Sequence, residues 1–205
     1  MGGASILTAV VHKALDIEPP LAVPVALYCS IGVGLPCFLV EGVEAADERT
    51  TRDRVRAAAL NQGYPWPQRA MFVTASRRLG RQLCSAALDL PIALGMLAAA
   101  DLIEAPPPGV AVLGSLNLDG ATVVPAGLET LIHAVVEHDG LRALIVPAAA
   151  AQVAMVHTPD TVSVFGVEDL RAAARMCEHL RSNPETFLDG DEWGWPRVWP
   201  PEAVR

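Results

Sequence analysis

Lysine is almost absent from this 205-residue chain, in which Lys13 is the only one. A phosphate-binding loop of the G-x-x-x-x-G-K-[ST] type needs a lysine that reaches the β and γ phosphates, followed by serine or threonine. Lys13 is followed by Ala14, so the chain contains no such motif. Nucleotide hydrolysis by this chain alone is therefore not expected.

Paired cysteines and long apolar runs are also missing. The four cysteines, Cys29, Cys37, Cys84 and Cys177, match neither a C-x-x-C site nor the density of a disulfide scaffold. We expect buried free thiols, with Cys29 and Cys37 flanking a hairpin turn across which they could face each other. The longest apolar stretches are too short or too interrupted to span a bilayer, and the N-terminus lacks the charged segment of a signal peptide. The sequence predicts a cytoplasmic protein with no membrane contact.

The spacing of metal ligands is wrong for a metalloprotease helix. The segment H-A-V-V-E-H begins at His133, whereas the two known helix patterns are H-E-x-x-H and H-x-x-E-H. Only His133 and Glu137 share a helix face, and His138 points elsewhere. Neither a metal nor a cofactor is expected.

Charge is distributed unevenly along the chain. The formal net charge is −8, and residues 101–205 hold fifteen of the 23 acidic residues. An acidic surface disfavours phosphate binding, so any DNA contact has to come from an arginine-rich segment in the first half. Arg49, Arg52 and Arg56 share one face of an expected helix, which is either a solvated face or part of a DNA or partner interface. The full candidate set is Arg49, Arg52, Arg56, Arg77, Arg78 and Arg81.

The stretch Ser85–Leu97 looks like the centre of the fold. Asp89 is a residue type that caps helices and Pro91 suits a first turn, so a helix is predicted from about Leu90 to Ala100. Nearly all of it is apolar, which places it inside the protein. Ser85 is a candidate nucleophile just ahead of this helix, although no histidine nearby is an obvious base, and a plain loop hydroxyl is the simpler interpretation.

The remaining pattern predicts strands first, then alternating helices and strands. Strands are expected near residues 5–13, 21–30, 37–40, 70–74, 110–118, 122–124, 144–147 and 162–165, with helices near 46–61, 127–138, 148–153 and 167–181. This order is typical of an α/β (α+β) fold with two layers and a mixed sheet over residues 1–181. Residues 182–205 form a Pro-rich, acidic tail. Its Trp193, Trp195 and Trp199 either pack back on the domain or dock on another chain.

Three ordered motifs carry a resemblance to a known family. They are V-G-L-P-C-F-L-V-E-G-V from Val33, R-D-R-V-R-A-A-A-L-N-Q-G from Arg52 and L-D-L-P-I-A-L-G-M-L-A-A from Leu88, and L-G-S-L-N-L-D-G from Leu113 continues the pattern. The chain from Ser5 to Leu180 resembles the N-terminal domain of the ComM/YifB family of AAA+ ATPases, which are related to the magnesium chelatase ATPase subunit. The resemblance implies a fold like that of the Lon protease domain.

In Lon proteases this fold carries a Ser–Lys dyad, and the resemblance implies where its members would fall. The serine position corresponds to Leu88 and the lysine position to Glu129 or Thr130. Leu88 offers no nucleophile, and neither Glu129 nor Thr130 can act as an amine base, so the dyad is expected to be lost. The chain also ends where the ATPase module of the family would begin.

These observations predict a free-standing, non-catalytic binding or assembly module. The expected partners are a separately encoded AAA+ motor, a second copy of the chain, or a DNA-processing complex. A serine hydrolase that uses Ser85 on a remodelled site is the first alternative. A DNA-binding accessory protein that uses the six arginines is the second.

Overall fold

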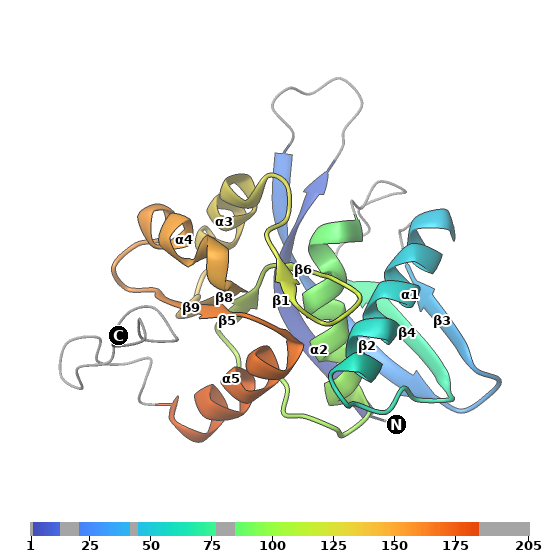
Figure 1. Ribbon diagram of the computed structural model, residues 1–205. Helices are drawn as coiled ribbons and strands as arrows, with labels where there is room; N and C mark the ends of the chain where they lie inside the picture. The colour runs from blue at the N-terminus through green and yellow to red at the C-terminus, as the bar shows by residue number, and fades with distance from the viewer. Residues whose placement is uncertain (1, 13–20, 42–44, 77–84, 185–205) are drawn as a thin grey trace.

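A seven-stranded mixed sheet forms the framework of the protein in the computed structural model, which describes residues 2–12, 21–41, 45–76 and 85–184 (Figure 1). Its strand order is β3-β4-β2-β1-β5-β8-β9. The strands are β1 (Gly2–His12), β2 (Leu21–Gly32), β3 (Cys37–Val40), β4 (Ala70–Ala75), β5 (Val110–Val112), β8 (Ala143–Pro147) and β9 (Ser163–Val167). A separate hairpin joins β6 (Ser115–Leu116) to β7 (Thr122–Val123).

The sheet has an antiparallel part and a parallel part. β2 runs antiparallel to both β1 and β4, whereas β1, β5, β8 and β9 are parallel to one another. Parallel neighbours need crossover connections, which helices supply here. These helices include α3 (Leu128–Val136), between β5 and β8, and α4 (Ala151–His157), between β8 and β9 and preceded by the 3₁₀ turn η2 (Ala148–Ala150). At the other edge of the sheet, β3 and β4 are also parallel, and α1 (Ala45–Asn61) connects them. The predicted α/β fold with a mixed sheet is confirmed.

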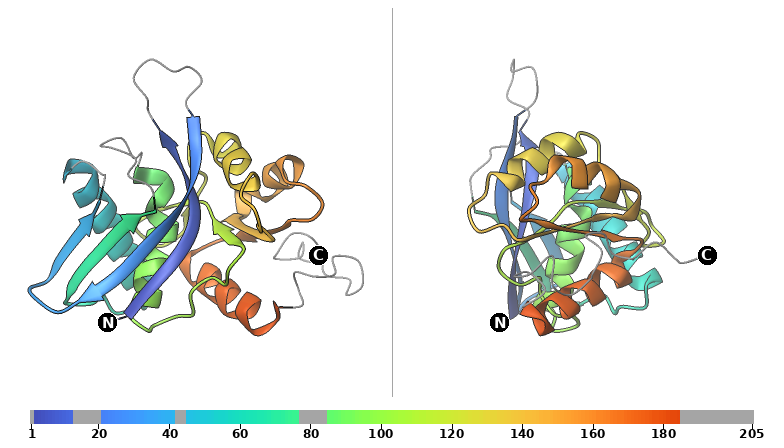
Figure 2. Two further views of the ribbon diagram at one scale, coloured as in Figure 1. Left: turned by 180° about the vertical axis from the view of Figure 1, so that it is seen from behind. Right: turned by 90° about the vertical axis from the view of Figure 1, so that its left-hand side faces the viewer.

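Helices cover both faces of the sheet (Figure 2). One hydrophobic core joins the sheet to α1 (Ala45–Asn61), α2 (Asp89–Ala99) and α5 (Leu170–Ser182), and a second core joins the opposite face to α3 and α4. The fold therefore has three layers and not the predicted two, because α3 and α4 lie on the face of the sheet opposite α2.

The central helix α2 is the most deeply enclosed helix among the described residues. All its residues except Ala98 are buried, as its almost uninterrupted apolar sequence predicts. It approaches β2 so closely that a Cβ added to Gly95 would lie 2.3 Å from Cys29 Sγ. Glycine at this position therefore allows the helix to contact the strand.

The prediction of a hairpin between β2 and β3 is wrong. β4 lies between these strands, pairing antiparallel with β2 and parallel with β3, so Cys29 and Cys37 do not face each other. Cys29 is a buried free thiol whose pKa burial raises to about 12, and Cys37 is an exposed one. Buried Cys177 on α5 likewise has its pKa raised by burial to about 12. Both buried thiols are unreactive packing groups.

Most of the predicted C-terminal tail lies outside the part of the chain that the structure describes. Trp193, Trp195 and Trp199 lie outside the described residues, so the placement of the tail stays a prediction. Within the described ranges, no helix is long and apolar enough to cross a membrane.

Candidate functional site

The stretch that leads into α2 begins with the 3₁₀ turn η1 (Ser85–Leu88). The side chain of Ser85 lies outside the described part of the structure, so its role as a nucleophile stays a prediction. Leu88 is fully buried in the core that contains α2. The first position that the family resemblance assigns to the dyad is thus occupied by a core residue.

The second dyad position lies at the start of α3. Glu129 is exposed, and its carboxylate lies 3.9 Å from Nε2 of His157 on α4. Thr130 is half-buried. Neither side chain carries an amine that could take a proton from a nucleophile at the start of α2.

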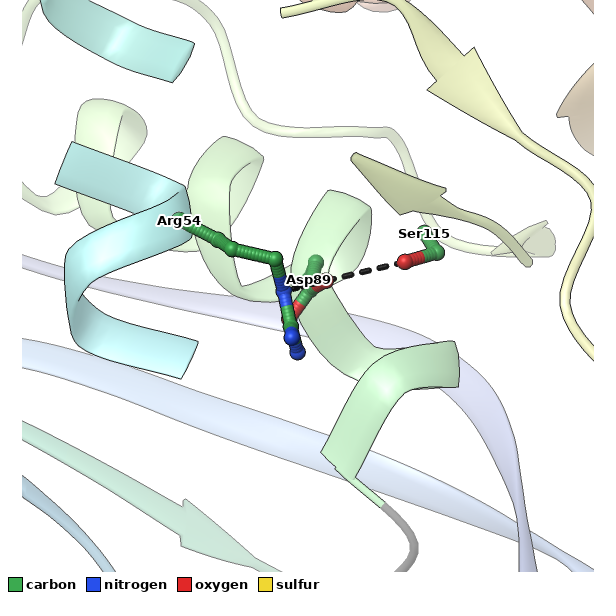
Figure 3. A network of polar contacts seen from close by, with 3 residues as sticks. All are labelled: Arg54, Asp89 and Ser115. Atoms are coloured by element: carbon green, nitrogen blue, oxygen red, sulfur yellow. Dashed lines mark hydrogen bonds and ion pairs between the residues drawn. The ribbon is translucent and has the colours of Figure 1, made fainter. Parts of the chain in front are cut away.

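Asp89 does not cap α2, contrary to the sequence-based prediction. The cap position is Leu88, which makes no side-chain capping bond. Asp89 is the first residue of the helix, and it has no exposed surface. Its carboxylate accepts hydrogen bonds from Arg54 on α1 and Ser115 on β6 (Figure 3). The distances are 2.7 Å from Arg54 Nε to Oδ2, 3.1 Å from Arg54 Nη2 to Oδ1, and 2.9 Å from Ser115 Oγ to Oδ2.

We call Arg54, Asp89 and Ser115 the buried polar cluster. Burial raises the pKa of Asp89, while the hydrogen bond and charge of Arg54, then Ser115 and the Leu116 amide, lower it in part. The side chain of Arg54 is 25% exposed and that of Asp89 is 0% exposed, so water reaches part of the arginine but not the carboxylate. No substrate can contact Asp89 in this arrangement, and the cluster acts by holding α1, α2 and β6 together.

The sequence analysis missed Arg54, although a signal was present. Thr51, Val55 and Ala58 form the buried side of α1, and Arg54 lies three residues after Thr51 and four before Ala58. A charged residue in phase with the buried face needs a buried partner of opposite charge. Asp89 is the one acidic residue in the apolar stretch that follows.

The arginine candidates are only partly placed. Arg49 and Arg56 are exposed on α1, and the described residues offer neither an ion pair. Arg52 lies 2.8 Å from Asp53, so part of its charge is already compensated. The other three candidates, Arg77, Arg78 and Arg81, lie outside the described residues.

Two of the five histidines lie close to each other. The rings of His133 on α3 and His157 on α4 are 5.2 Å apart, edge to face. Across the described ranges, no group of three or more His, Cys, Asp or Glu side chains is arranged to hold a metal ion.

Comparison with known proteins identifies the family. Residues 28–150, more than half of the chain, match the family described as subunit ChlI of Mg-chelatase. The chain belongs to this family. The matched residues include all of α1 and α2 and the whole buried polar cluster, so the cluster lies within the ChlI-family part of the chain. They do not include α5.

Individual relatives carry two of the names that the sequence motifs indicated. The uncharacterized protein YifB of Salmonella typhimurium is 29% identical over 153 residues, which are 72% of this ChlI-family chain and 29% of that protein. YifB of Escherichia coli is 30% identical over 132 residues, 62% of this chain and 25% of the relative. The competence protein ComM of Haemophilus influenzae is 30% identical over 95 residues, 46% of this chain and 18% of ComM. The chain thus spans less than a third of the length of these relatives.

Proposed function

We propose that this ChlI-family domain is a non-catalytic binding or assembly module that works with an AAA+ motor, in DNA processing. The observation that carries the proposal is the state of the positions where the resemblance implies a protease dyad. Leu88 has no exposed surface, and Glu129 is exposed next to His157. A peptidase would need a nucleophile and a base in these places.

The names of the relatives support the assembly part of the proposal. The family description is that of a subunit, hence of a component of a larger complex. ComM is named as a competence protein. Competence is a DNA-handling process, and the likeness to ComM supports DNA processing as the setting for this chain.

Turnover by the pure 205-residue protein tests the non-catalytic part. Casein, a general ester substrate and ATP should each show no hydrolysis above buffer. A serine-directed fluorophosphonate probe should not label the protein at Ser85. Hydrolysis that disappears in Ser85→Ala but persists in Ser5→Ala, an exposed serine on β1, would establish the hydrolase alternative instead.

The assembly part needs a defined partner. A purified ComM-type AAA+ ATPase is mixed with this protein, and the mass of any complex is measured by light scattering after size exclusion. We expect a complex of fixed stoichiometry. If both proteins elute at their separate masses across micromolar concentrations, the motor-partner proposal is wrong.

A second candidate function, DNA binding, is favoured by Arg49 and Arg56 on α1, which are exposed and have no ion pair within the described part of the chain. Branched DNA should bind with an affinity that falls as salt rises, and Arg49→Gln/Arg56→Gln should reduce the slope of log K against log salt by about 2. Arg175→Gln, on α5, is the matched control and should leave the slope unchanged. Equal slopes for all three proteins would exclude this face of α1 as the DNA contact.

A further inference from the structure

A cavity of about 530 Å³ lies at the C-terminal end of α2, on the side away from the buried polar cluster. Its walls come from the N-terminal end of β1, the segment after α2, and α5, which lie together in both views of Figure 2. Ligand sites for small molecules commonly occupy about 300–1,000 Å³, so this cavity has a suitable size.

Asp101 in the wall of this cavity has an unusual backbone conformation. Its φ is 59°, and it is the only non-glycine residue with a positive φ among the described residues. It ends α2 in a left-handed turn, in which the Asp101 amide donates to Ala98 O and the Leu102 amide donates to Leu97 O. Glycine is the favoured residue at this position, and another residue type costs on the order of 1 kcal/mol. The carboxylate is therefore held at the cavity at some cost in stability.

The charged groups of the cavity do not cancel one another. Arg181 and Glu104 form a pair at 3.3 Å, and Arg181 also donates to the carbonyl of Ala105. The carboxylates of Asp101 and Glu178 have no hydrogen bond or ion pair among the described residues, and the Arg175 guanidinium has no ion pair there. Two carboxylates and one guanidinium are thus left facing the solvent of the cavity.

Tyr64 adds an uncharged group to this set. It is half-buried in the cavity wall, and burial raises the pKa of its phenol, which therefore stays protonated at neutral pH. Its hydroxyl can donate or accept a hydrogen bond, and its ring face can attract a cation.

We propose that this cavity binds a basic amino acid, arginine or lysine, either free or at the end of a peptide. Free arginine or lysine carries two cations and one carboxylate, the complement of Asp101, Glu178 and Arg175. The same residue at the C-terminal end of a peptide keeps the side-chain cation and the carboxylate but has no α-ammonium. The lining charges are exposed to water, so the interaction is weak and sensitive to salt. Its expected dissociation constant is in the millimolar range.

Titration of the full chain with L-arginine, followed by amide chemical shifts in NMR, tests the proposal. We expect saturable shifts confined to residues 101–105, α5 and the start of β1. L-citrulline, which lacks the side-chain charge, and agmatine, which lacks the carboxylate, should each bind about two- to fivefold more weakly. The peptide Ala-Ala-Arg distinguishes a free amino acid from a peptide C-terminus as the ligand. It has no ammonium group on the arginine α-carbon, so it should bind as tightly as free arginine only if that group makes no contact.

Variants link the shifts to the named carboxylates. Asp101→Asn/Glu178→Gln should weaken L-arginine binding about tenfold or more, whereas Asp139→Asn, an exposed acid in the turn after α3, should bind like the wild type. Asparagine tolerates the left-handed conformation, so the double variant should fold. The proposal is wrong if millimolar arginine gives no saturable shift of these amides, or if the double variant binds as tightly as the parent.

Discussion

The two ends of α2 treat an acidic side chain in opposite ways. At the N-terminal end, Asp89 has no exposed surface and accepts hydrogen bonds from Arg54, Ser115 and the Leu116 amide. At the C-terminal end, Asp101 is exposed and its carboxylate has no partner among the described residues. A buried charge has to be compensated within the protein, whereas water can compensate an exposed one. The first carboxylate therefore contributes to folding, and the second remains available to a ligand.

The family match covers the buried polar cluster completely and the cavity only in part. Residues 28–150 contain every member of the buried polar cluster. Arg175, Glu178 and Arg181 of the cavity lie on α5, after the matched residues. The cluster thus lies wholly within the ChlI-family part of this chain, whereas the cavity combines matched residues such as Asp101 with residues of α5 outside the match.

Removal of Arg54 should give the largest change in stability and should distinguish the two ends of α2 most clearly. Arg54→Met leaves the buried Asp89 carboxylate without its cation, and we expect a loss of about 3–5 kcal/mol in the free energy of unfolding at pH 7. Arg175→Met, at the other end of α2, should change it by less than about 0.5 kcal/mol. Urea unfolding measures both.

A second substitution shows whether the loss comes from the unpaired charge. Arg54→Met/Asp89→Asn retains an oxygen that accepts from Ser115 and Leu116 but carries no charge, so it should regain much of the stability. If the double variant is less stable than Arg54→Met alone, the buried carboxylate is not the cause.

The pH dependence of stability should sharpen the assignment. The pKa of Asp89 is already raised by burial, and removal of Arg54 raises it further. The folded state then binds a proton more tightly than the unfolded state, so stability is lost as pH rises through the folded pKa. Unfolding of Arg54→Met should therefore become more favourable between about pH 5 and 7, by at most about 1.4 kcal/mol per pH unit relative to the wild type. A constant difference between the two proteins over this range would contradict the assignment.

The elements of the fold could be predicted from the sequence because they depend on local patterns. The prediction for α2 was Leu90 to Ala100, and the helix spans Asp89–Ala99. An uninterrupted apolar run after a turn signal indicates a buried helix without knowledge of its neighbours. The strand order was not predictable in this way, since β4 enters between β2 and β3 from more than 30 residues along the chain.

The candidate site was harder to predict for a related reason. An aspartate before Leu90 and Pro91 is typical of a helix cap, and the sequence nearby gives no reason to reject that reading. The partner that makes Asp89 a buried ion pair lies 35 residues earlier, on α1. Only the phase of Arg54 with the buried face of α1 indicates it, and the exposed arginines in the same helix obscure that signal.

Between the two ends, α2 depends on close packing, and Gly95→Ala tests it. The added Cβ would lie 2.3 Å from Cys29 Sγ and 3.0 Å from Cys29 Cβ. We expect a loss of about 1–3 kcal/mol, because overpacking outweighs the better helix propensity of alanine. Cys29→Ala in the same chain removes the shorter contact and should recover part of the loss, as thermal unfolding would show. Stability equal to that of the parent in Gly95→Ala alone would mean that α2 and β2 can separate without cost.

The smallest change in stability should come from Asp101, at the exposed C-terminal end of α2, and it should be a gain. Asp101→Gly relieves the left-handed backbone at φ 59° and keeps the turn that ends α2. The free energy of unfolding should rise by about 0.5–1 kcal/mol, while L-arginine binding to the cavity weakens. Asp101→Asn should weaken L-arginine binding as much as Asp101→Gly does. Its gain in stability should be smaller, because asparagine tolerates the left-handed conformation less well than glycine. A fall in stability in Asp101→Gly would show that the carboxylate stabilises the end of α2. The carboxylates at both ends of the helix would then contribute to folding, by different amounts.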